Sequence, residues 1–314
     1  MIIHSLCTSE FEHLDIAARY HVHNLVLLHP DWSMGCPPTK QLAINELKHI
    51  HNTYPKVKVY LCCDILFHNN NFDRLSDYLN TIQGHLTGIQ CQDIGLLIWL
   101  TEHFPLLECW WNDTFLSMNS QSLQGIFNLG ATRITLSHQL SMKDINCIQN
   151  NFQTQQFDIL VQGPFAIQYS KRSYMKNYQA DQAKPMVYTL ENKELEGRFF
   201  RFVENSTGTV MFSHFDRCLI EQPLEGLNKL IDARFYTNQE LEHALNSYES
   251  KKSRLDLQKN LSHPQKPGFF IINKTNNDWR DKKIEFKSNK EILGTVIAIN
   301  DTDMIIESIK PIVL

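Results

Sequence analysis

Short apolar runs alternate with amphipathic segments along the first half of the chain. The runs lie at residues 2–6, 24–29, 57–63, 88–93, 106–111, 133–138 and 157–163. The segments between them repeat apolar residues with the helical period, as at Leu42, Leu47 and Ile50. A strand followed by a helix, repeated about every 20 to 30 residues, predicts a parallel sheet with crossover helices.

Seven such units before residue 165 favour a closed barrel over an open sheet. Residues 227–231 could supply a last strand, and residues 238–251 a last helix. We therefore predict an α/β fold, a parallel (β/α)8-like TIM barrel that occupies residues 1–250. Side chains able to cap helices precede several of the periodic segments, and these are Thr8, Thr39, Asn119 and Ser141.

The pattern changes after Gly163. Residues 164–198 are rich in Lys, Tyr and Gln without a clear period, which predicts a long loop or two short helices, and residues 199–213 predict a hairpin that turns at 205–208. Residues 251–267 are polar and predict a linker. Residues 268–314 contain the runs PGFFIINK, KKIEFKS, ILGTVIAIN and MIIESIK, which predict a small C-terminal β extension.

Composition narrows the class of protein and the kind of partner. A chain of 314 residues with 42% hydrophobic residues is too apolar to be fully disordered. Its formal net charge of -4 provides no global basic field, so a nucleic acid would have to meet a local patch or a second protein.

The N-terminal residues contain neither a basic leader nor an apolar core of signal-peptide length, and no segment reaches about 20 uninterrupted apolar residues. We expect a cytoplasmic location and no membrane partner. The eight cysteines are scattered without C-x-x-C spacing, which is typical of small buried hydrophobes in a reducing compartment.

The carboxyl ends of the predicted strands are the places to look for chemistry, because TIM barrels carry their active sites there. Asn112 and Thr114 follow one such strand and are candidate substrate ligands. Farther along, cations and aromatic residues interleave between Tyr169 and Tyr178, a pattern that suits phosphate contact and base stacking. The alternative is a solvated loop whose tyrosines cover the barrel mouth.

The sequence contains few signs of a metal site or of a hydrolase nucleophile. Among the 14 histidines, His49 and His51 do not share a helical face, and no His-Glu-x-x-His motif occurs, so no metal site is predicted. Ser170, His138 and Asp113 could be named as a catalytic triad. No Gly-x-Ser-x-Gly turn supports Ser170 as its nucleophile.

Five segments, in order, resemble the collagenase-like peptidase family U32. The segment DILVQGPFAIQYSKRSYMKNY (158–178) is similar to the family's most recognisable stretch. Residues 65–79, 128–141, 212–221 and 231–248 agree with further family segments, so that the resemblance covers about residues 1–250. The residues that match in the first segment are Gly163, Ser170, Arg172, Asn177 and Tyr178.

The resemblance implies the barrel and a role in hydroxylation. Although the family is named for peptidases, members include factors that hydroxylate tRNA wobble uridine, ribosomal RNA cytidine and the ubiquinone ring. The segment HPDWSMGCPP (29–38) looks most like the shorter Gram-positive members that work beside a larger paralogue on tRNA. We therefore expect a tRNA wobble-uridine 5-hydroxylation factor with tRNA and a larger paralogue as partners. The alternatives are a collagenase-like peptidase and a non-catalytic scaffold subunit of a hetero-oligomer.

The same resemblance implies roles for individual residues. Arg172, Ser170 and Asp232 are the expected catalytic group, in which Arg172 grips an anion, Ser170 orients the substrate and Asp232 pairs with Arg172 or Arg234. The expected substrate-binding residues are Asn112, Thr114, Tyr169, Asn177, Tyr178 and Arg234.

Departures from the family pattern concern the cofactor. Several members hold an iron–sulfur cluster, which requires four converging ligands. Only Cys218 occupies a matching position, and Phe165 stands where another cysteine would follow the glycine. We therefore expect no iron–sulfur cluster and no other cofactor.

Overall fold

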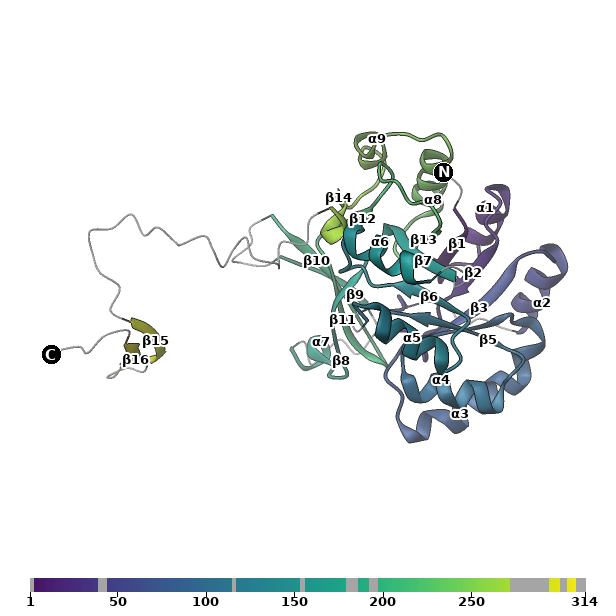
Figure 1. Cartoon of the computed structure of the whole chain (residues 1–314), viewed down its shortest axis with the longest axis horizontal. Helices are drawn as coiled ribbons and strands as arrows, with labels where there is room; N and C mark the ends of the chain where they lie inside the picture. The colour runs from purple at the N-terminus through teal and green to yellow at the C-terminus, as the bar shows by residue number, and fades with distance from the viewer. Residues whose placement is uncertain are drawn as a thin grey trace. The chain divides into compact units, whose positions relative to one another are not determined.

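The computed structural model describes residues 3–38, 44–114, 117–152, 156–178, 186–191, 197–271, 294–299 and 304–308. The chain divides into two compact units, Met1–Asn273 and Lys274–Leu314. The larger unit contains the predicted barrel (Figure 1). None of the helices within the described ranges is long and apolar enough to cross a membrane.

Eight parallel strands close into a barrel in the larger unit. Each pairs with the next along the chain, and β13 pairs with both β7 and β1, which closes the ring and confirms the predicted (β/α)8-like fold. The strands are β1 (Ser5–Thr8), β2 (Asn24–Leu27), β3 (Lys58–Cys63), β4 (Gly88–Cys91), β5 (Glu108–Asn112), β6 (Arg133–Leu136), β7 (Gln156–Gly163) and β13 (Asn228–Asp232).

Both faces of these strands are buried, which explains why they read as continuous apolar runs. Side chains such as Val26, Tyr60 and Trp110 fill the barrel interior, and the alternate residues Leu25 and Leu61 pack outward in the main core. The barrel is therefore a packed core, open to substrate only where side chains at its rim leave space.

Helices follow six of the first seven barrel units. They are α1 (His13–Arg19), α2 (Ile44–Thr53), α3 (Asn69–Ile82), α4 (Ile94–His103), α5 (Ser120–Asn128) and α6 (Met142–Asn151), with η1 (Gln83–His85) extending α3. After β13 comes α8 (Asn238–Glu249).

Two of the predicted helix caps are confirmed. Asn119 accepts a hydrogen bond from the Ser122 amide, and Ser141 and Asp144 form a capping box. The expectation for Thr8 is wrong, because its hydroxyl bonds to His13 Nδ1 at 2.7 Å and α1 begins without a side-chain cap. Thr39 lies outside the described residues.

A small antiparallel sheet is inserted between β7 and β13. It contains β8 (Ala166–Ser170), β9 (Met186–Glu191), β10 (Phe199–Asn205) and β11 (Gly208–Phe212), in the order β8-β11-β10-β9, with α7 (Tyr174–Tyr178) after β8. The β10–β11 hairpin confirms the prediction for 199–213. The prediction of only a loop or helices for 164–198 is wrong, because β9 pairs with the following strand β10, and β8 pairs with β11 about 40 residues farther along the chain.

The segment after α8 packs onto the same unit. It contains α9 (Arg254–Gln258), β14 (Gln265–Lys266) and η2 (Gly268–Phe270), and β14 pairs with β12 (Asp216–Cys218), which in turn pairs with β7. Residues 251–267, predicted as a linker, thus carry a helix and a short strand, and the compact unit reaches Asn273 rather than ending at 250.

The described part of the smaller unit is a single hairpin. It joins β15 (Gly294–Ile299) to β16 (Met304–Ser308), antiparallel, where the sequence predicts two strands. The predicted run KKIEFKS lies outside the described residues, and residues 268–271 of PGFFIINK form a 3-10 turn rather than a strand.

A polar network lies inside the barrel at the end opposite its mouth. The Arg133 guanidinium makes two hydrogen bonds to the Asp158 carboxylate, and a third, of 3.0 Å, to Ser5 Oγ. The central carbon of the guanidinium lies 3.9 Å from the centre of the Trp110 ring, over its face. This network closes that end of the barrel and links β1, β5, β6 and β7.

We expect Arg133→Met to lower the free energy of unfolding by about 3–5 kcal/mol, because Asp158 would remain buried without its counter-charge. Urea denaturation of the purified chain measures this change. Arg19→Met removes an exposed ion pair with Glu242 and should cost under about 1 kcal/mol. Equal stability of both variants would contradict the assignment of Arg133 as a buried structural partner.

Candidate functional site

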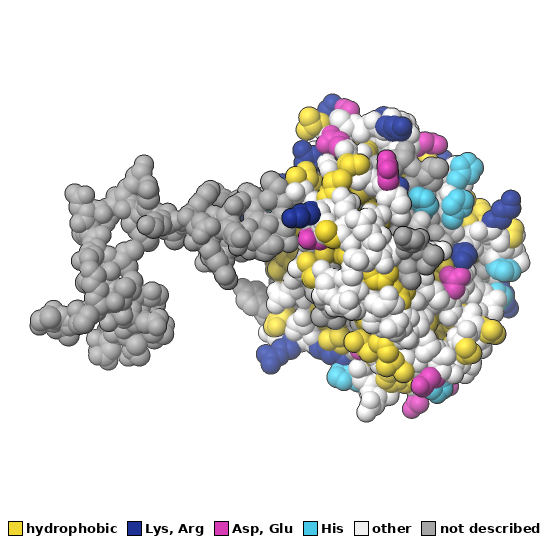
Figure 2. Space-filling view, in the orientation of Figure 1, with side chains coloured by type: hydrophobic (Ala, Val, Ile, Leu, Met, Phe, Trp, Pro, Cys, Tyr) yellow, Lys and Arg dark blue, Asp and Glu magenta, His cyan; other side chains and the backbone are white. Residues whose placement is uncertain are grey.

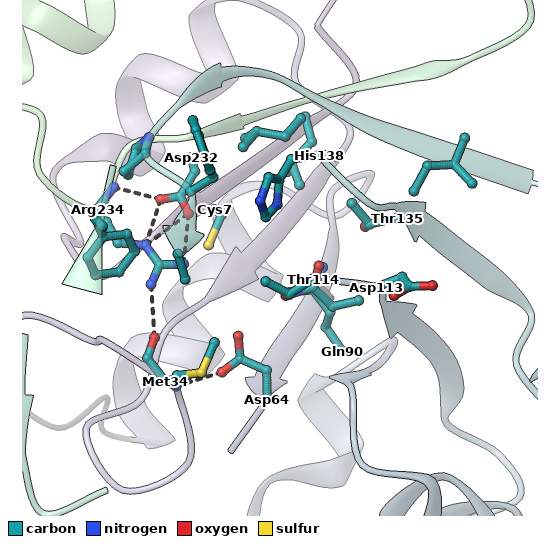
Figure 3. A pocket seen from close by; sticks show the side chains of 18 residues that line it. Cys7, Met34, Asp64, Gln90, Asp113, Thr114, Thr135, His138, Asp232 and Arg234 are labelled. Carbon is teal, nitrogen blue, oxygen red and sulfur yellow. Dashed lines mark hydrogen bonds and ion pairs between the residues drawn. The ribbon is translucent and has the colours of Figure 1, made fainter. Parts of the chain in front are cut away.

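A pocket opens at the carboxyl ends of the barrel strands, and we call it the mouth. Figure 3 shows its side chains converging from different strands and from the loop after β2. Its polar lining residues are Cys7, Asp64, Gln90, Asn112, Asp113, Thr114, Thr135, His138, Asp232 and Arg234. The apolar lining includes Phe165 and Phe212, and Phe212 belongs to the inserted sheet. The inserted sheet therefore forms one wall of the mouth.

Arg234 and Asp232 form a buried pair at one side of the mouth. Arg234 Nε lies 2.9 Å from Asp232 Oδ2, and Arg234 Nη2 lies 2.7 Å from the same oxygen. Arg234 Nη1 donates to the carbonyl oxygen of Met34 at 2.9 Å (Figure 3). The guanidinium is thus engaged in holding the loop after β2 against the end of β13, and the expected pairing of Asp232 with Arg234 is present.

Asp64 anchors the same loop from the opposite side. Its Oδ1 accepts a hydrogen bond from the Met34 amide at 2.6 Å. Burial raises the pKa of the Asp64 carboxyl, while Arg234 acts in the opposite direction. Met34 is therefore fixed at its amide by Asp64 and at its carbonyl by Arg234, which gives the mouth a rigid rim.

Cys7 and Gln90 lie deeper in the mouth. Burial raises the pKa of the Cys7 thiol well above its usual value, so the thiol stays protonated and is a poor nucleophile. Among the described residues, the Gln90 side-chain nitrogen has no hydrogen-bond partner although it is buried. A buried amide donor without a partner is available to a ligand.

His138 lines the mouth as a neutral imidazole. Burial, followed by the charge of Arg217, lowers its pKa to about 3. Its ring lies 4.6 Å from the ring of Phe165, centre to centre. At neutral pH it offers a flat, uncharged surface to a bound molecule.

The residues named above as a possible triad are not assembled. His138 and Asp113 line the mouth, but Ser170 is absent from its lining, and its hydroxyl accepts a bond from the Arg172 amide at 3.2 Å. The Asp113 carboxylate accepts hydrogen bonds from the Ser117 amide at 2.9 and 3.0 Å. The described geometry therefore lacks the contacts that would activate Ser170.

A second pocket adjoins the mouth along β5 and β8. The two share Met34, Asn112, Asp113 and Thr114 in their linings. The second pocket is further lined by Leu66, Gln92, Trp111, Ile167, Gln168 and Tyr169. Asn112 and Thr114 thus stand where the two spaces meet.

The expected site residues fall into two groups. Asn112, Thr114, Asp232 and Arg234 line the mouth, and Tyr169 lines the second pocket, where its hydroxyl donates to the Thr207 carbonyl at 2.7 Å.

The remaining expected residues lie away from the mouth. Arg172 and Asn177 are exposed, and Ser170 is half-buried; none of the three lines either pocket. The Tyr178 side chain lies outside the described residues. The structure therefore does not bring the expected catalytic group, Arg172, Ser170 and Asp232, together around the mouth.

Several mouth residues are missing from the set of expected catalytic and substrate-binding residues. Asp64 and His138 stand directly at predicted strand ends, a position that could have marked them. Cys7 and Gln90 are within strands, and only the inward-facing register of β1 and β4 identifies them.

The described residues do not fit an iron–sulfur cluster. All eight cysteines lie in described parts of the chain; Cys7, Cys36 and Cys62 share one buried cluster, and Cys218 belongs to a different one. Within those parts, no three His, Cys, Asp or Glu side chains are grouped to hold a metal ion. Cys218 therefore has no companion thiolates with which to ligate a cluster.

Comparison with known proteins is consistent with the sequence motifs. The sequence model of peptidase family U32 matches residues 9–270. The chain is 28% identical over 186 residues to a Bacillus subtilis (strain 168) protein named tRNA hydroxylation protein P2, a match covering 56% of this chain and 58% of that protein. It is 26% identical over 139 residues to an Escherichia coli (strain K12) protein named tRNA hydroxylation protein P, covering 44% of this chain and 30% of that one.

Each match spans less than two thirds of the relative's own length. Among solved structures, that of the U32 peptidase Mk0906 is similar with a TM-score of 0.49 and 13% identity, covering 74% of this chain and 92% of that chain. The family match extends from the first barrel helix region to the turn after β14. This chain belongs to peptidase family U32.

Proposed function

We propose that the chain acts in hydroxylation of tRNA, at carbon 5 of the wobble uridine. The observation that carries the proposal is the match, over 186 residues, to a relative named for tRNA hydroxylation. The mouth is compatible with it, since amide and hydroxyl side chains, together with the rings of His138, Phe165 and Phe212, suit a planar polar group. Enzymes that act on a base take it out of its stack into such a pocket.

Within this proposal, residues at the mouth orient the base. Asn112 and Thr114, at the junction of the two pockets, hydrogen-bond to it, and the Gln90 amide donates to one of its oxygens. Asp232 acts through Arg234 as a positioning residue for the loop after β2. Arg172, Ser170 and Asn177 contact the RNA outside the mouth, with Arg172 at a phosphate, and the contact expected for Tyr178 stays a prediction.

Proteolysis is supported less well by the same geometry. The Cys7 thiol is protonated, and Ser170 lies outside the pocket that contains His138. A peptidase needs an activated nucleophile next to its base. We therefore favour RNA modification over cleavage of protein substrates.

We further propose that a larger paralogue is the working partner of this chain in the cytoplasm. The matched relatives are longer than the region they share with this chain, so the shared part need not carry the whole activity.

Mass spectrometry of tRNA nucleosides tests the proposed activity. Cells without this gene should lose 5-hydroxyuridine derivatives at the wobble position, and a plasmid copy of the gene should restore them. An unchanged nucleoside profile in the deletion strain would overturn the proposed function.

Asn112→Ala should lower the rate of wobble-uridine modification about tenfold, and with it the modified fraction in growing cells, since one orienting hydrogen bond is worth about 1.4 kcal/mol. Asn128→Ala, at an exposed position on α5, is the matched control and should leave modification unchanged. Complementation of the deletion strain provides the measurement. Equal modification by both variants would remove Asn112 from the site.

Native mass spectrometry tests the partnership. When this chain and the larger paralogue from the same genome are co-expressed, a hetero-oligomer should be recovered, whereas the chain alone should lack that mass. Recovery of the two chains only as separate species would contradict the partnership and leave the tRNA proposal to be judged by the nucleoside profile.

A further inference from the structure

A groove lined by basic side chains runs beside the mouth, between the inserted sheet and the segment that carries β14. Arg198 and Arg201 come from the inserted sheet region, His214 from the turn after β11, and His263 and Lys266 from the C-terminal segment of the larger unit. Its lining, as far as the chain is described, contains no Asp or Glu. Three permanent cations therefore face one open space.

This local charge contrasts with the rest of the protein. The chain has a net charge of -4, and Figure 2 shows charged side chains of both signs spread over the visible face. Arg201 pairs with the buried Asp216, which also accepts a hydrogen bond from Tyr236. Arg198 and Lys266 are both exposed, and within the described ranges neither forms an ion pair, so these ranges give the groove an excess of positive charge.

The pKa values of the two histidines in the groove are lowered by burial and by the neighbouring positive charges. Burial, then Arg201 and His214, lower the pKa of His263 to about 4. Burial, then Lys266 and Arg198, lower the pKa of His214. Both imidazoles are therefore neutral at neutral pH, and their rings add flat polar surface rather than charge.

Aromatic side chains accompany the cations. Phe199 lies in the groove with 49% of its surface exposed, although a ring of this size is usually buried. The rings of His214 and Phe200 lie 5.2 Å apart, and Lys266 Nζ lies 5.4 Å from the ring of Phe215. Cations interleaved with accessible rings are the features of a surface that binds single-stranded nucleic acid.

One layer of rings separates the groove from the mouth. Phe212 lines the mouth, Phe235 lines the groove, and the two rings meet edge to face at 5.1 Å. The neighbouring residue Arg234 lines the mouth. A nucleotide whose base enters the mouth would thus place its neighbours within reach of the groove.

We propose that this groove binds the single-stranded RNA adjoining the nucleotide that enters the mouth, with Arg198 and Lys266 contacting phosphates and Phe199 stacking on a base. The inference rests on the proposed function, because it takes RNA as the partner. An acidic protein surface would match the cations but would leave the exposed ring of Phe199 without a role. RNA has phosphates that can contact the cations and bases that can stack on the ring.

The test compares charge reversals in the full-length chain. We expect Arg198→Glu/Lys266→Glu to bind a fluorescent anticodon stem-loop RNA at least about tenfold more weakly at about 0.1 M salt. The slope of log affinity against log salt should fall by about 1.4, since each single-strand phosphate contact contributes about 0.7. Lys48→Glu/Lys143→Glu, at exposed positions on α2 and α6, changes the net charge equally and should bind like the wild type.

Stacking is tested separately. Phe199→Ala should weaken RNA binding about fivefold or more. Leu255→Ala, which removes an even more exposed apolar side chain on α9, should have no effect. If polyglutamate displaces the RNA from the wild type at equal charge concentration and Phe199→Ala binds normally, the surface is one for an acidic protein and the inference is overturned.

The remaining outcomes separate the groove from the activity. Equal RNA affinity of the two charge-reversed double variants, or failure of the wild type to bind the stem-loop, overturns the groove as an RNA site. The nucleoside profile of the deletion strain is independent of either result and alone decides the proposed function.

Discussion

The ion pair between Arg133 and Asp158 determines how the inside of this barrel can be filled. A guanidinium and a carboxylate buried among eight strands tolerate few alternatives, because each charge needs the other and additional hydrogen bonds. Arg133 also supports the Trp110 ring, whose indole nitrogen donates to Thr135 Oγ1 at 2.8 Å. Thr135 is itself part of the mouth lining. The floor of the mouth therefore rests on Thr135 and Trp110, which are supported in turn by the Arg133–Asp158 pair.

The rim of the mouth depends on a second set of buried charges. Arg234 holds a backbone carbonyl of the loop after β2, and Asp64 holds an amide of the same loop. Loops at the end of a TIM barrel are free to vary, so fixing one of them requires interactions of this kind. The cost of burying these charges is offset by their hydrogen bonds, and the result is a preorganised opening.

The sequence predicts the barrel well because its strands are buried on both faces and therefore stand out as apolar runs. The predicted run at 57–63 corresponds to Lys58–Cys63, and the run at 24–29 contains Asn24–Leu27. The inserted sheet could not be foreseen in full, since β8 depends on β11, a partner separated from it by two other strands, and β9 lies in a polar stretch without a clear period. Strand-end position identified Asn112 and Thr114, whereas Arg172 was identified by the family motif and by the interleaved cations and aromatic residues around it, and it lies outside the mouth. Neither strand-end position nor the family motif identifies Gln90, because it lies within β4 and reaches the mouth only by facing into the barrel.

The inserted sheet leaves and re-enters the barrel at adjoining points. Gly163, the last residue of β7, is paired in register with Arg217 of β12, so the intervening segment begins and ends at neighbouring backbone positions. Gly163 also has a φ of +119°, and a Cβ there would lie 2.1 Å from the Asp232 carbonyl oxygen, which ties the exit point to the barrel. The two ends of the segment therefore join the barrel at a single place. The segment can therefore change in length and sequence without displacing the barrel strands that hold the mouth together.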